Sequence, residues 1–297
     1  ITTLYESTSV SGRRKFLAGT KSKIAVLNER AGNWRILADG LGGPYSDTRN
    51  CGCPTDRFKV AQLGNVVIFT NNYDPVLYWV MDAGPDGCDG WSVDYIQDLV
   101  LLEITKAKVV ASWKGFIFIA NVEQEGERFS NRILWCDYND PLSWFPGGNT
   151  LAFTQDLADG DRIVAMETIG QQLRIYTRKG AKETAIYDVM AVGGETTFNF
   201  QEIYRGPDGI QYENSIVNRG DVHNWLSESG LMELGPYDRT PLRVEWMHRS
   251  SAAIYDGIPG VWLGPLSPFA MAMESGAWTM AAGFEAVNKD ACDHVIG

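Results

Sequence analysis

Among the side chains of this sequence, the carboxyl groups of Asp and Glu are the best candidates for catalysis. A glycoside hydrolase needs two carboxyl groups, one with a raised pKa that acts as an acid and one that acts as a base or a nucleophile. Glutamates recur in or beside expected strands at Glu167, Glu183, Glu202 and Glu228. Their spacing marks no pair, and no repeated Asp-box of the form S-x-D-x-G-x-T-W is present. A solvated face of an acidic protein accounts for the same pattern, so carbohydrate chemistry stays an alternative.

Nucleophilic catalysis would have to use one of the three histidines, His223, His248 and His294. Neither a G-x-S-x-G elbow nor a papain-like cysteine context accompanies them. His223 falls within an expected strand, where a hydrogen-bonded or surface histidine is the favoured interpretation. We therefore expect no catalytic residues, and the chain is not predicted to be an enzyme.

Metal binding is also disfavoured by spacing. Cys51-Gly52-Cys53 with Cys88 lacks the paired C-x₂₋₄-C spacing and the four ligands of a structural zinc site. Asp156, Asp159 and Asp161 lack the spacing of a calcium loop and indicate a turn into a strand. We expect no metal and no cofactor. An odd count of five cysteines predicts no disulfide framework and a reducing compartment during synthesis.

A repeat of about 50 residues must position all of these side chains. In each unit one glycine ends a stretch of alternating apolar residues and a second such stretch follows directly. These predicted structural turn glycines are Gly12, Gly64, Gly115, Gly170 and Gly220, at spacings of 52, 51, 55 and 50 residues. Tight hairpins need residues with positive φ, which glycine adopts without steric penalty. Each unit therefore contains a hairpin that turns at its glycine.

Further runs rich in Val, Ile, Phe, Tyr and Trp follow each hairpin, so most units hold four strands. Four-stranded units repeated radially describe an all-β fold, the β-propeller. Its six blades are expected near 1–40, 56–96, 106–154, 161–203, 210–247 and 250–284. The last blade would use strands over Ser251–Tyr255, Gly260–Leu263, Phe269–Met273 and Trp278–Ala282. Residues 285–297 would close the ring or lead into another region.

One segment, Asp98–Lys108, has enough apolar residues to suggest a helix, but the β-branched Ile104 and Thr105 argue against it. The chain opens at Ile1 rather than Met, so we expect a fragment or a processed chain. No apolar run approaches the ~20 residues that span a bilayer, and no membrane partner is expected.

The net charge of −11 disfavours a protein that grips phosphate backbones, because such binding depends on clustered Lys and Arg. An acidic surface is compatible with DNA that passes by, since it repels the duplex and lets it slide.

Three segments share their order and spacing with one protein family. The first has the form F-x-x-A-x-x-G-x-x-V-I-x-T-N-x-x-D-P and is carried by Phe58, Ala61, Gly64, Val67, Thr70, Asn71, Asp74 and Pro75. The second is similar to N-R-x-x-W-S-x-x-x-D-P-x-x-W and is carried by Asn131, Arg132, Trp135, Asp140, Pro141 and Trp144. The third includes Gly206-Pro207 and a hairpin from Ser227. Together they resemble the tail-nozzle, or packaged-DNA-stabilising, proteins of short-tailed bacteriophages.

This resemblance implies a structural virion protein, made in the host bacterial cytoplasm and located in the phage tail. Its members form a ring, usually a hexamer, below the portal and adaptor, and surround the channel through which DNA leaves without sequence-specific binding. Cys136 departs from the family where a small polar residue is usual, and no long segments flank the propeller. The alternative is a carbohydrate-active or carbohydrate-binding propeller, such as a glycosidase, a depolymerase or a lectin. A host protein-interaction propeller is a third possibility, although G-H…W-D and kelch patterns are missing from the sequence.

Overall fold

The computed structural model describes residues 3–20, 22–28, 32–42, 57–82, 90, 92–180, 183–192, 197–210, 214–227 and 229–244, and the backbone of 271–274 and 277–280. These residues form five four-stranded antiparallel sheets and one two-stranded sheet. Consecutive strands pair within every four-stranded sheet, so each sheet is a simple meander. The predicted fold class is confirmed: the chain is an all-β protein with the β-propeller fold.

The five complete sheets are numbered here as blades 1 to 5 in chain order. Blade 1 comprises β1 (Thr3–Thr8), β2 (Arg14–Gly19), β3 (Ile24–Asn28) and β4 (Asn33–Ala38). Blade 2 comprises β5 (Lys59–Leu63), β6 (Val66–Thr70), β7 (Leu77–Val80) and β8 (Asp94–Tyr95). Blade 3 comprises β9 (Ile104–Trp113), β10 (Phe116–Gln124), β11 (Glu127–Trp135) and β12 (Phe153–Asp156).

Blade 4 comprises β13 (Arg162–Ile169), β14 (Gln172–Arg178), β15 (Thr184–Ala191) and β16 (Phe198–Gly206). Blade 5 comprises β17 (Val217–Asn218), β18 (His223–Ser227), β19 (Gly230–Leu234) and β20 (Leu242–Arg243). The two-stranded sheet pairs β21 (Met271–Glu274) with β22 (Ala277–Met280). The predicted sixth-blade strands Ser251–Tyr255 and Gly260–Leu263, and the segment 285–297, lie outside the described residues.

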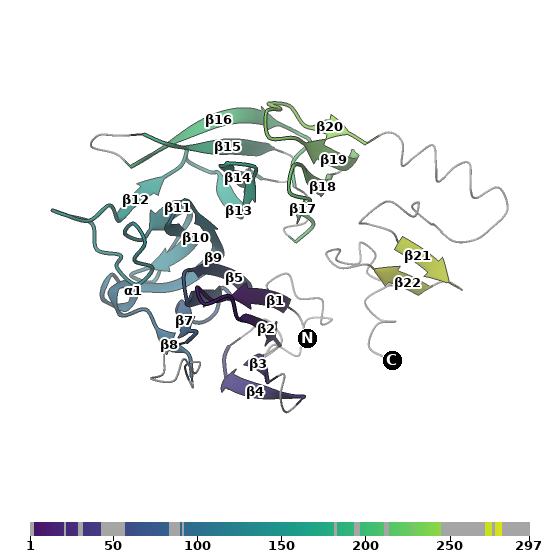
Figure 1. Ribbon diagram of the computed structural model, residues 1–297. Coiled ribbons are helices and arrows are strands. Elements are labelled where there is room, and N and C mark those ends of the chain that lie inside the picture. Colours follow the sequence, from purple (N-terminus) through teal and green to yellow (C-terminus); the bar gives the residue numbers. More distant parts are fainter. Residues whose placement is uncertain are drawn as a thin grey trace.

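The first strand of each blade lies innermost. β1 contacts β5, β5 contacts β9, β9 contacts β13, and β13 contacts β17. The fourth strands β4, β8, β12, β16 and β20 lie at the periphery (Figure 1). Blades 2, 3 and 4 therefore each present one sheet face to the blade before them and the other to the blade after them.

The core lies between these faces. Leu17 and Val26 of blade 1 pack with Phe69 and Trp79 of blade 2, all of them buried. A larger cluster joins blades 2, 3 and 4, and a third cluster joins blades 4 and 5 through buried side chains that include Trp225. Strands in the middle of the series are consequently apolar on both faces, which is why they contain continuous runs such as Phe116–Ala120.

The segment Asp98–Lys108 contains both kinds of element. A short helix, α1 (Gln97–Leu101), precedes β9, which begins at Ile104. The β-branched pair Ile104 and Thr105 thus lies in a strand, as their side chains favour. In the part of the chain that the structure describes, no helix is long and apolar enough to cross a membrane.

The five repeat glycines all occupy turns between the first and second strands of their blades. Their φ angles are +84° at Gly12, +58° at Gly64, +80° at Gly115, +56° at Gly170 and +91° at Gly220. Gly115 carries a second constraint, because a Cβ at this position would lie 2.6 Å from the ring of Tyr138 and 2.8 Å from Oδ1 of Asn139. At Gly12, by contrast, a Cβ would meet no atom within 4 Å.

Candidate functional site

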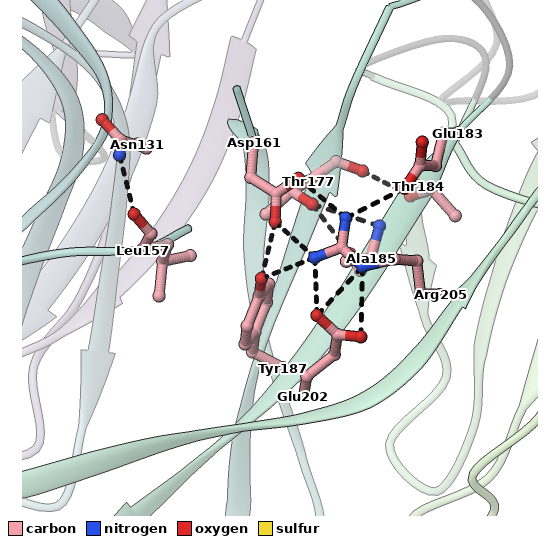
Figure 2. Close-up of polar contacts among 10 residues, drawn as sticks. All are labelled: Asn131, Leu157, Asp161, Thr177, Glu183, Thr184, Ala185, Tyr187, Glu202 and Arg205. Carbon is pink, nitrogen blue, oxygen red and sulfur yellow. Dashed lines mark hydrogen bonds and ion pairs between the residues drawn. The ribbon is translucent and has the colours of Figure 1, made fainter. Parts of the chain in front are cut away.

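Blade 4 brings two of the four candidate glutamates together. Glu183 and Glu202 both contact the guanidinium of Arg205, and Asp161 joins them (Figure 2). Glu167 lies on a different face of the same blade, and Glu228 lies outside the described residues. The charged cluster in this part of the chain is therefore centred on Arg205, which no motif in the sequence marks as a functional residue.

The Arg205 cluster contains three carboxylates around one cation. Arg205 Nη2 lies 2.8 Å from Asp161 Oδ2 and 2.5 Å from Glu202 Oε2, and Nη1 lies 3.1 Å from Glu183 Oε1. Tyr187 donates its hydroxyl to Asp161 Oδ2 at 2.5 Å. Figure 2 shows all four partners pointing toward the guanidinium. Charge-assisted hydrogen bonds of this kind are among the strongest in proteins.

A β-bulge in the last strand pair creates this arrangement. Ala185 is opposite Arg205 and Tyr187 is opposite Glu202, with a register shift between Ile186 and Tyr187. Residues three apart in a regular strand point to opposite faces of the sheet. The extra residue of the bulge places Glu202 and Arg205 on the same face, the one that also carries Tyr187.

Electrostatics stabilise the charged forms in this cluster. The Asp161 side chain is fully buried, and burial raises its pKa. Hydrogen bonds from Arg205 and Tyr187 outweigh that effect, so the pKa of Asp161 lies below its usual value. Hydrogen bonds to Asp161 and Glu202 raise the pKa of Arg205. The guanidinium occupies the space between the carboxylates, and the cluster joins β16 to the chain segment that leads into β13.

Glu167 belongs to a second polar row, on the face of blade 4 that packs against blade 5. The register aligns it with Arg174 and Asp188. Burial raises the pKa of Glu167, and the ammonium of Lys59 offsets part of that effect. Arg174 is itself buried and pairs with Asp188 Oδ1 at 2.8 Å. A carboxyl with a raised pKa fits one half of the glycosidase requirement.

Arg174 also connects two blades. Its guanidinium donates to the carbonyls of Gly235 at 2.7 Å, Pro236 at 2.9 Å and Asp238 at 3.1 Å. These carbonyls belong to the turn that follows β19 of blade 5. One side chain thereby satisfies three backbone acceptors that the turn leaves without strand partners.

His223 is confirmed as a hydrogen-bonded histidine. Its Nε2 lies 2.9 Å from the Thr168 carbonyl and its Nδ1 lies 2.7 Å from the Tyr176 hydroxyl. A carbonyl can only accept, so Nε2 carries the proton and Nδ1 accepts from Tyr176. Burial lowers the pKa of His223 to about 4, and the neutral ring joins blade 5 to blade 4. His248 and His294 lie outside the described residues.

The metal candidates separate in space. Asp156 pairs with Arg132 at 2.7 Å, and Asp161 pairs with Arg205. Across the described ranges, no group of His, Cys, Asp and Glu is arranged to hold a metal ion. Cys136 is buried, and burial raises the pKa of its thiol to about 12. The other four cysteines lie outside the described residues.

A polar contact also spans the inner strands. Lys59 Nζ in β5 donates to Asn214 Oδ1 at 2.7 Å, and Asn214 lies three residues before β17. Lys59 belongs to the inner strand of blade 2, and Asn214 lies in the segment that leads into blade 5. This hydrogen bond therefore joins two parts of the fold that are 155 residues apart in the sequence.

Residues of the first resembling segment make contacts between blades. Asn71 donates to the Gly42 carbonyl at 2.9 Å and accepts from the amide of Asp74 at 2.9 Å. Asp74 Oδ1 accepts from the amide of Gly42 at 3.0 Å. Thr70 donates its hydroxyl to the Ala107 carbonyl of blade 3. The T-N-x-x-D phrase thus connects blade 2 to the chain on either side of it.

Residues of the second segment fix the outer part of blade 3. Asn131 donates to the Leu157 carbonyl at 2.7 Å (Figure 2). Trp135 Nε1 donates to the Leu151 carbonyl at 2.8 Å, and Trp144 Nε1 donates to the Pro141 carbonyl at 2.9 Å. Cys136 Sγ accepts from the Ile117 amide at 3.0 Å.

No protein-family model and no curated protein matches the chain. Among solved structures, the chain is similar to a periplasmic gluconolactonase of Pseudomonas aeruginosa, with 11% identity, a TM-score of 0.45, and coverage of 80% of this chain and 67% of that one. It is similar to the β-propeller domain of Swd1 from Myceliophteria thermophila, with 9% identity, a TM-score of 0.46, and coverage of 80% and 71%. It is also similar to the six-bladed Aleuria aurantia lectin, with 14% identity, a TM-score of 0.39, and coverage of 77% and 72%. At such low similarity, none of these activities is transferred to this chain.

Proposed function

We propose that this chain is a structural protein of a bacteriophage tail, a nozzle or connector component. In this proposal it assembles as a ring, a hexamer, below the portal and adaptor, and it retains or passes the genomic DNA. Three resembling segments in the expected order support the proposal, because together they reach from blade 2 to blade 5.

The observation that carries the proposal is the set of hydrogen bonds that the residues of those segments make within and between blades. Thr70, Asn71 and Asp74 connect neighbouring blades, and Asn131 and Trp135 fix the outer strand of blade 3. Each of these polar groups is bonded within the fold. A sequence pattern made of such contacts specifies a rigid body, as expected for a part of a larger assembly.

The charge distribution supports the same proposal. Arg132, Arg174 and Arg205 each pair with at least one carboxylate, so their positive charges are compensated within the protein. Phosphate-backbone binding requires uncompensated Lys and Arg that can release counterions from DNA. A chain with a net charge of −11 is suited to contact with DNA that must move past it.

The carbohydrate alternative would need two carboxyl groups that both face a bound sugar. In glycoside hydrolases the two carboxyl groups lie roughly 5–10 Å apart. Glu183 and Glu202 are the candidate pair that the fold brings together, and both bind Arg205. Glu167 has the raised pKa of an acid, but its row supplies Arg174 and Asp188, which pair with each other. These contacts favour the structural proposal over the alternative.

Immunogold electron microscopy tests the proposal. Antibodies against the purified chain should label the tail-bearing vertex of the virions whose genome encodes it. Mass photometry of the chain mixed with the portal and adaptor proteins of the same phage should show a complex with the mass of a ring of chains bound to them. None of the three proteins should give this mass when measured alone. Absence of the chain from purified virions, together with release of reducing sugars from a bacterial surface polysaccharide, would instead support the carbohydrate alternative.

A further inference from the structure

The turn after β19 carries an aromatic side chain that stands almost fully in solvent. Tyr237 is 91% exposed, the largest exposed fraction of any large apolar residue in the described part of the chain. Arg239 and Leu242 follow it along the segment that leads into β20, and both are also exposed. We refer to Tyr237, Arg239 and Leu242 as the blade 5 surface.

The fold holds this turn in one conformation. The buried guanidinium of Arg174 binds three of its carbonyls, as described above. Within the turn, the Gly235 amide donates to Asp238 Oδ2 at 2.8 Å, and the Asp238 amide donates to the Gly235 carbonyl at 3.2 Å. Pro241 is buried and anchors the chain before β20. An aromatic residue on a preorganised turn loses little conformational freedom on binding, so this turn has the properties of a binding element.

A second apolar surface lies on the outer part of blade 3. Its four large side chains are between 40% and 56% exposed, and they belong to Tyr138, Phe145, Leu151 and Phe153. Asp137 Oδ1 holds two of these residues together, because it accepts from the amides of Tyr138 and Leu151, both at 2.8 Å. Trp135 packs beneath Phe153, with ring centroids 5.8 Å apart. We refer to Tyr138, Phe145, Leu151 and Phe153 as the blade 3 surface.

The two surfaces carry opposite charges at their edges. Arg239 forms no ion pair with any carboxylate of the described residues, in contrast to the paired arginines described above. Asp140 lies two residues after Tyr138, is exposed, and forms no ion pair with any Lys or Arg of the same ranges. Complementary charges beside an apolar contact orient two partners and disfavour wrong ones. The blade 3 surface is therefore complementary to the blade 5 surface in charge.

Both surfaces lie at the end of the propeller where the turn glycines gather. Trp113, which precedes the turn of Gly115, donates from Nε1 to the carbonyl of the residue after Gly170 at 3.1 Å, so the turns of blades 3 and 4 lie at the same end. Tyr138 packs against Gly115, where a Cβ would lie 2.6 Å from its ring. Pro236 lies beside Gly170, where a Cβ would lie 3.8 Å from Cβ of the proline.

We propose that the blade 5 surface of one copy binds the blade 3 surface of a second copy, with Tyr237 among its apolar side chains and Arg239 beside Asp140. The strands β12 and β20 lie apart on the periphery of one propeller (Figure 1), so the two surfaces meet only between copies. A contact between two different surfaces of identical chains repeats from copy to copy, and it closes into a ring when the rotation between copies is suitable. Because both surfaces lie at the same end, neighbouring copies stand side by side.

This inference rests on the proposed function in one respect, since both require that the chain associates with itself. The two proposals nevertheless fail separately. A chain that is absent from virions but makes this contact would remove the tail function alone. A chain that labels the tail vertex but associates through other residues would remove this contact alone.

Photo-cross-linking of the full chain tests the contact. The photoreactive residue p-benzoylphenylalanine replaces Tyr237 in one variant and, as a control, Tyr95, which is exposed in β8 of blade 2. Each variant is mixed with ¹⁵N-labelled unchanged chain, with and without the portal and adaptor proteins. A link between an unlabelled and a labelled peptide, identified by mass spectrometry, then joins two copies.

We expect the Tyr237 probe to join to labelled peptides from residues 137–156, at a yield roughly tenfold or more above that of the Tyr95 probe. Links to another part of the labelled chain would overturn the proposal. Links to the portal or adaptor alone, or no links between proteins in either mixture, would overturn it as well.

A charge exchange provides a second measurement. Arg239→Asp places two carboxylates at each contact, and Asp140→Arg places two cations there, so either variant alone should associate roughly tenfold or more weakly by mass photometry. Mixing the two variants pairs opposite charges at every contact and should restore association. A mixture that associates no better than its components would contradict the contact. Arg239 is exposed and without an ion pair in the described chain, so Arg239→Asp should leave Tm unchanged, which separates lost binding from lost folding.

Discussion

The guanidinium of Arg205 grips both oxygens of Asp161, with Nη2 at 2.8 Å from Oδ2 and Nη1 at 3.1 Å from Oδ1. Arg205 lies near the end of the last strand of blade 4, and Asp161 directly precedes the first strand. The pair therefore joins the two ends of one four-stranded unit across its width. The sheet hydrogen bonds connect these strands only through the two strands between them.

Replacing Arg205 by Ala should destabilise the fold by about 3 kcal/mol, because the buried carboxylate of Asp161 would lose its cation. Urea unfolding followed by tryptophan fluorescence measures this loss. Arg14→Ala is the control, since the Arg14–Glu6 pair is exposed and should contribute less than about 1 kcal/mol. If both variants lost the same small amount, Asp161 would have to be compensated by another group.

His223 predicts a stability change with pH. Its folded pKa of about 4 lies below its unfolded value, so the unfolded chain binds more protons between the two values. The contribution of the neutral ring is complete above about pH 6.5 and is lost as the pH falls toward 4, by about 3 kcal/mol in total. Urea unfolding at several pH values measures how steeply the free energy of unfolding falls as the pH drops from about 6.5 to about 4. This fall should be smaller for His223→Gln than for the unchanged chain. Identical slopes would mean that His223 titrates normally.

Two turn glycines form a matched pair for substitution. Gly12→Ala and Gly115→Ala both place a side chain at positive φ, which costs about 1–2 kcal/mol. Gly115→Ala also pushes a Cβ into Tyr138 and Asn139, so its loss should be larger, about 2–4 kcal/mol. Thermal and urea unfolding of both variants measures the difference. Equal losses would indicate that the Tyr138 side chain moves away without cost.

Arg174→Lys should loosen the turn at Gly235–Asp238 without unfolding the blade. A lysine ammonium lacks the planar fork with which Arg174 reaches three carbonyls. Hydrogen exchange read by mass spectrometry should show at least tenfold faster exchange in this turn. Arg178→Lys, at the half-buried end of the same strand, is the control and should leave the turn protected. Unchanged protection in the Arg174 variant would show that the turn holds its own conformation.

The sequence predicts the blades better than it predicts the contacts that join them. Period and turn chemistry are local properties, and the glycines at Gly64 and Gly170 lie in the turns where such properties place them. The Arg205 cluster depends on a bulge between β15 and β16, and no local pattern distinguishes a bulged strand from a regular one. The local sequence around Asp161 likewise indicates only a turn, because its partner Arg205 lies 44 residues away.

Arg174 is a second residue whose contacts the local sequence does not predict. A cation inside a strand pattern indicates a solvent-facing position, yet this side chain is buried against a turn of the next blade. Its acceptors are backbone carbonyls, which leave no signature in the sequence. Residue type therefore predicted the strands of blade 4, while the neighbouring blade determined what lies on their faces.

The hydrogen bond between Lys59 and Asn214 has a consequence for any passage of DNA. Two side chains that meet at 2.7 Å between the inner strand of blade 2 and the segment before blade 5 leave no bore between these two parts for a double helix. If several copies surround a genome, as proposed, the conduit lies between them and its wall consists of blade exteriors. Its diameter is then fixed by how many propellers stand side by side, so the count of subunits, rather than the shape of one subunit, decides what can pass.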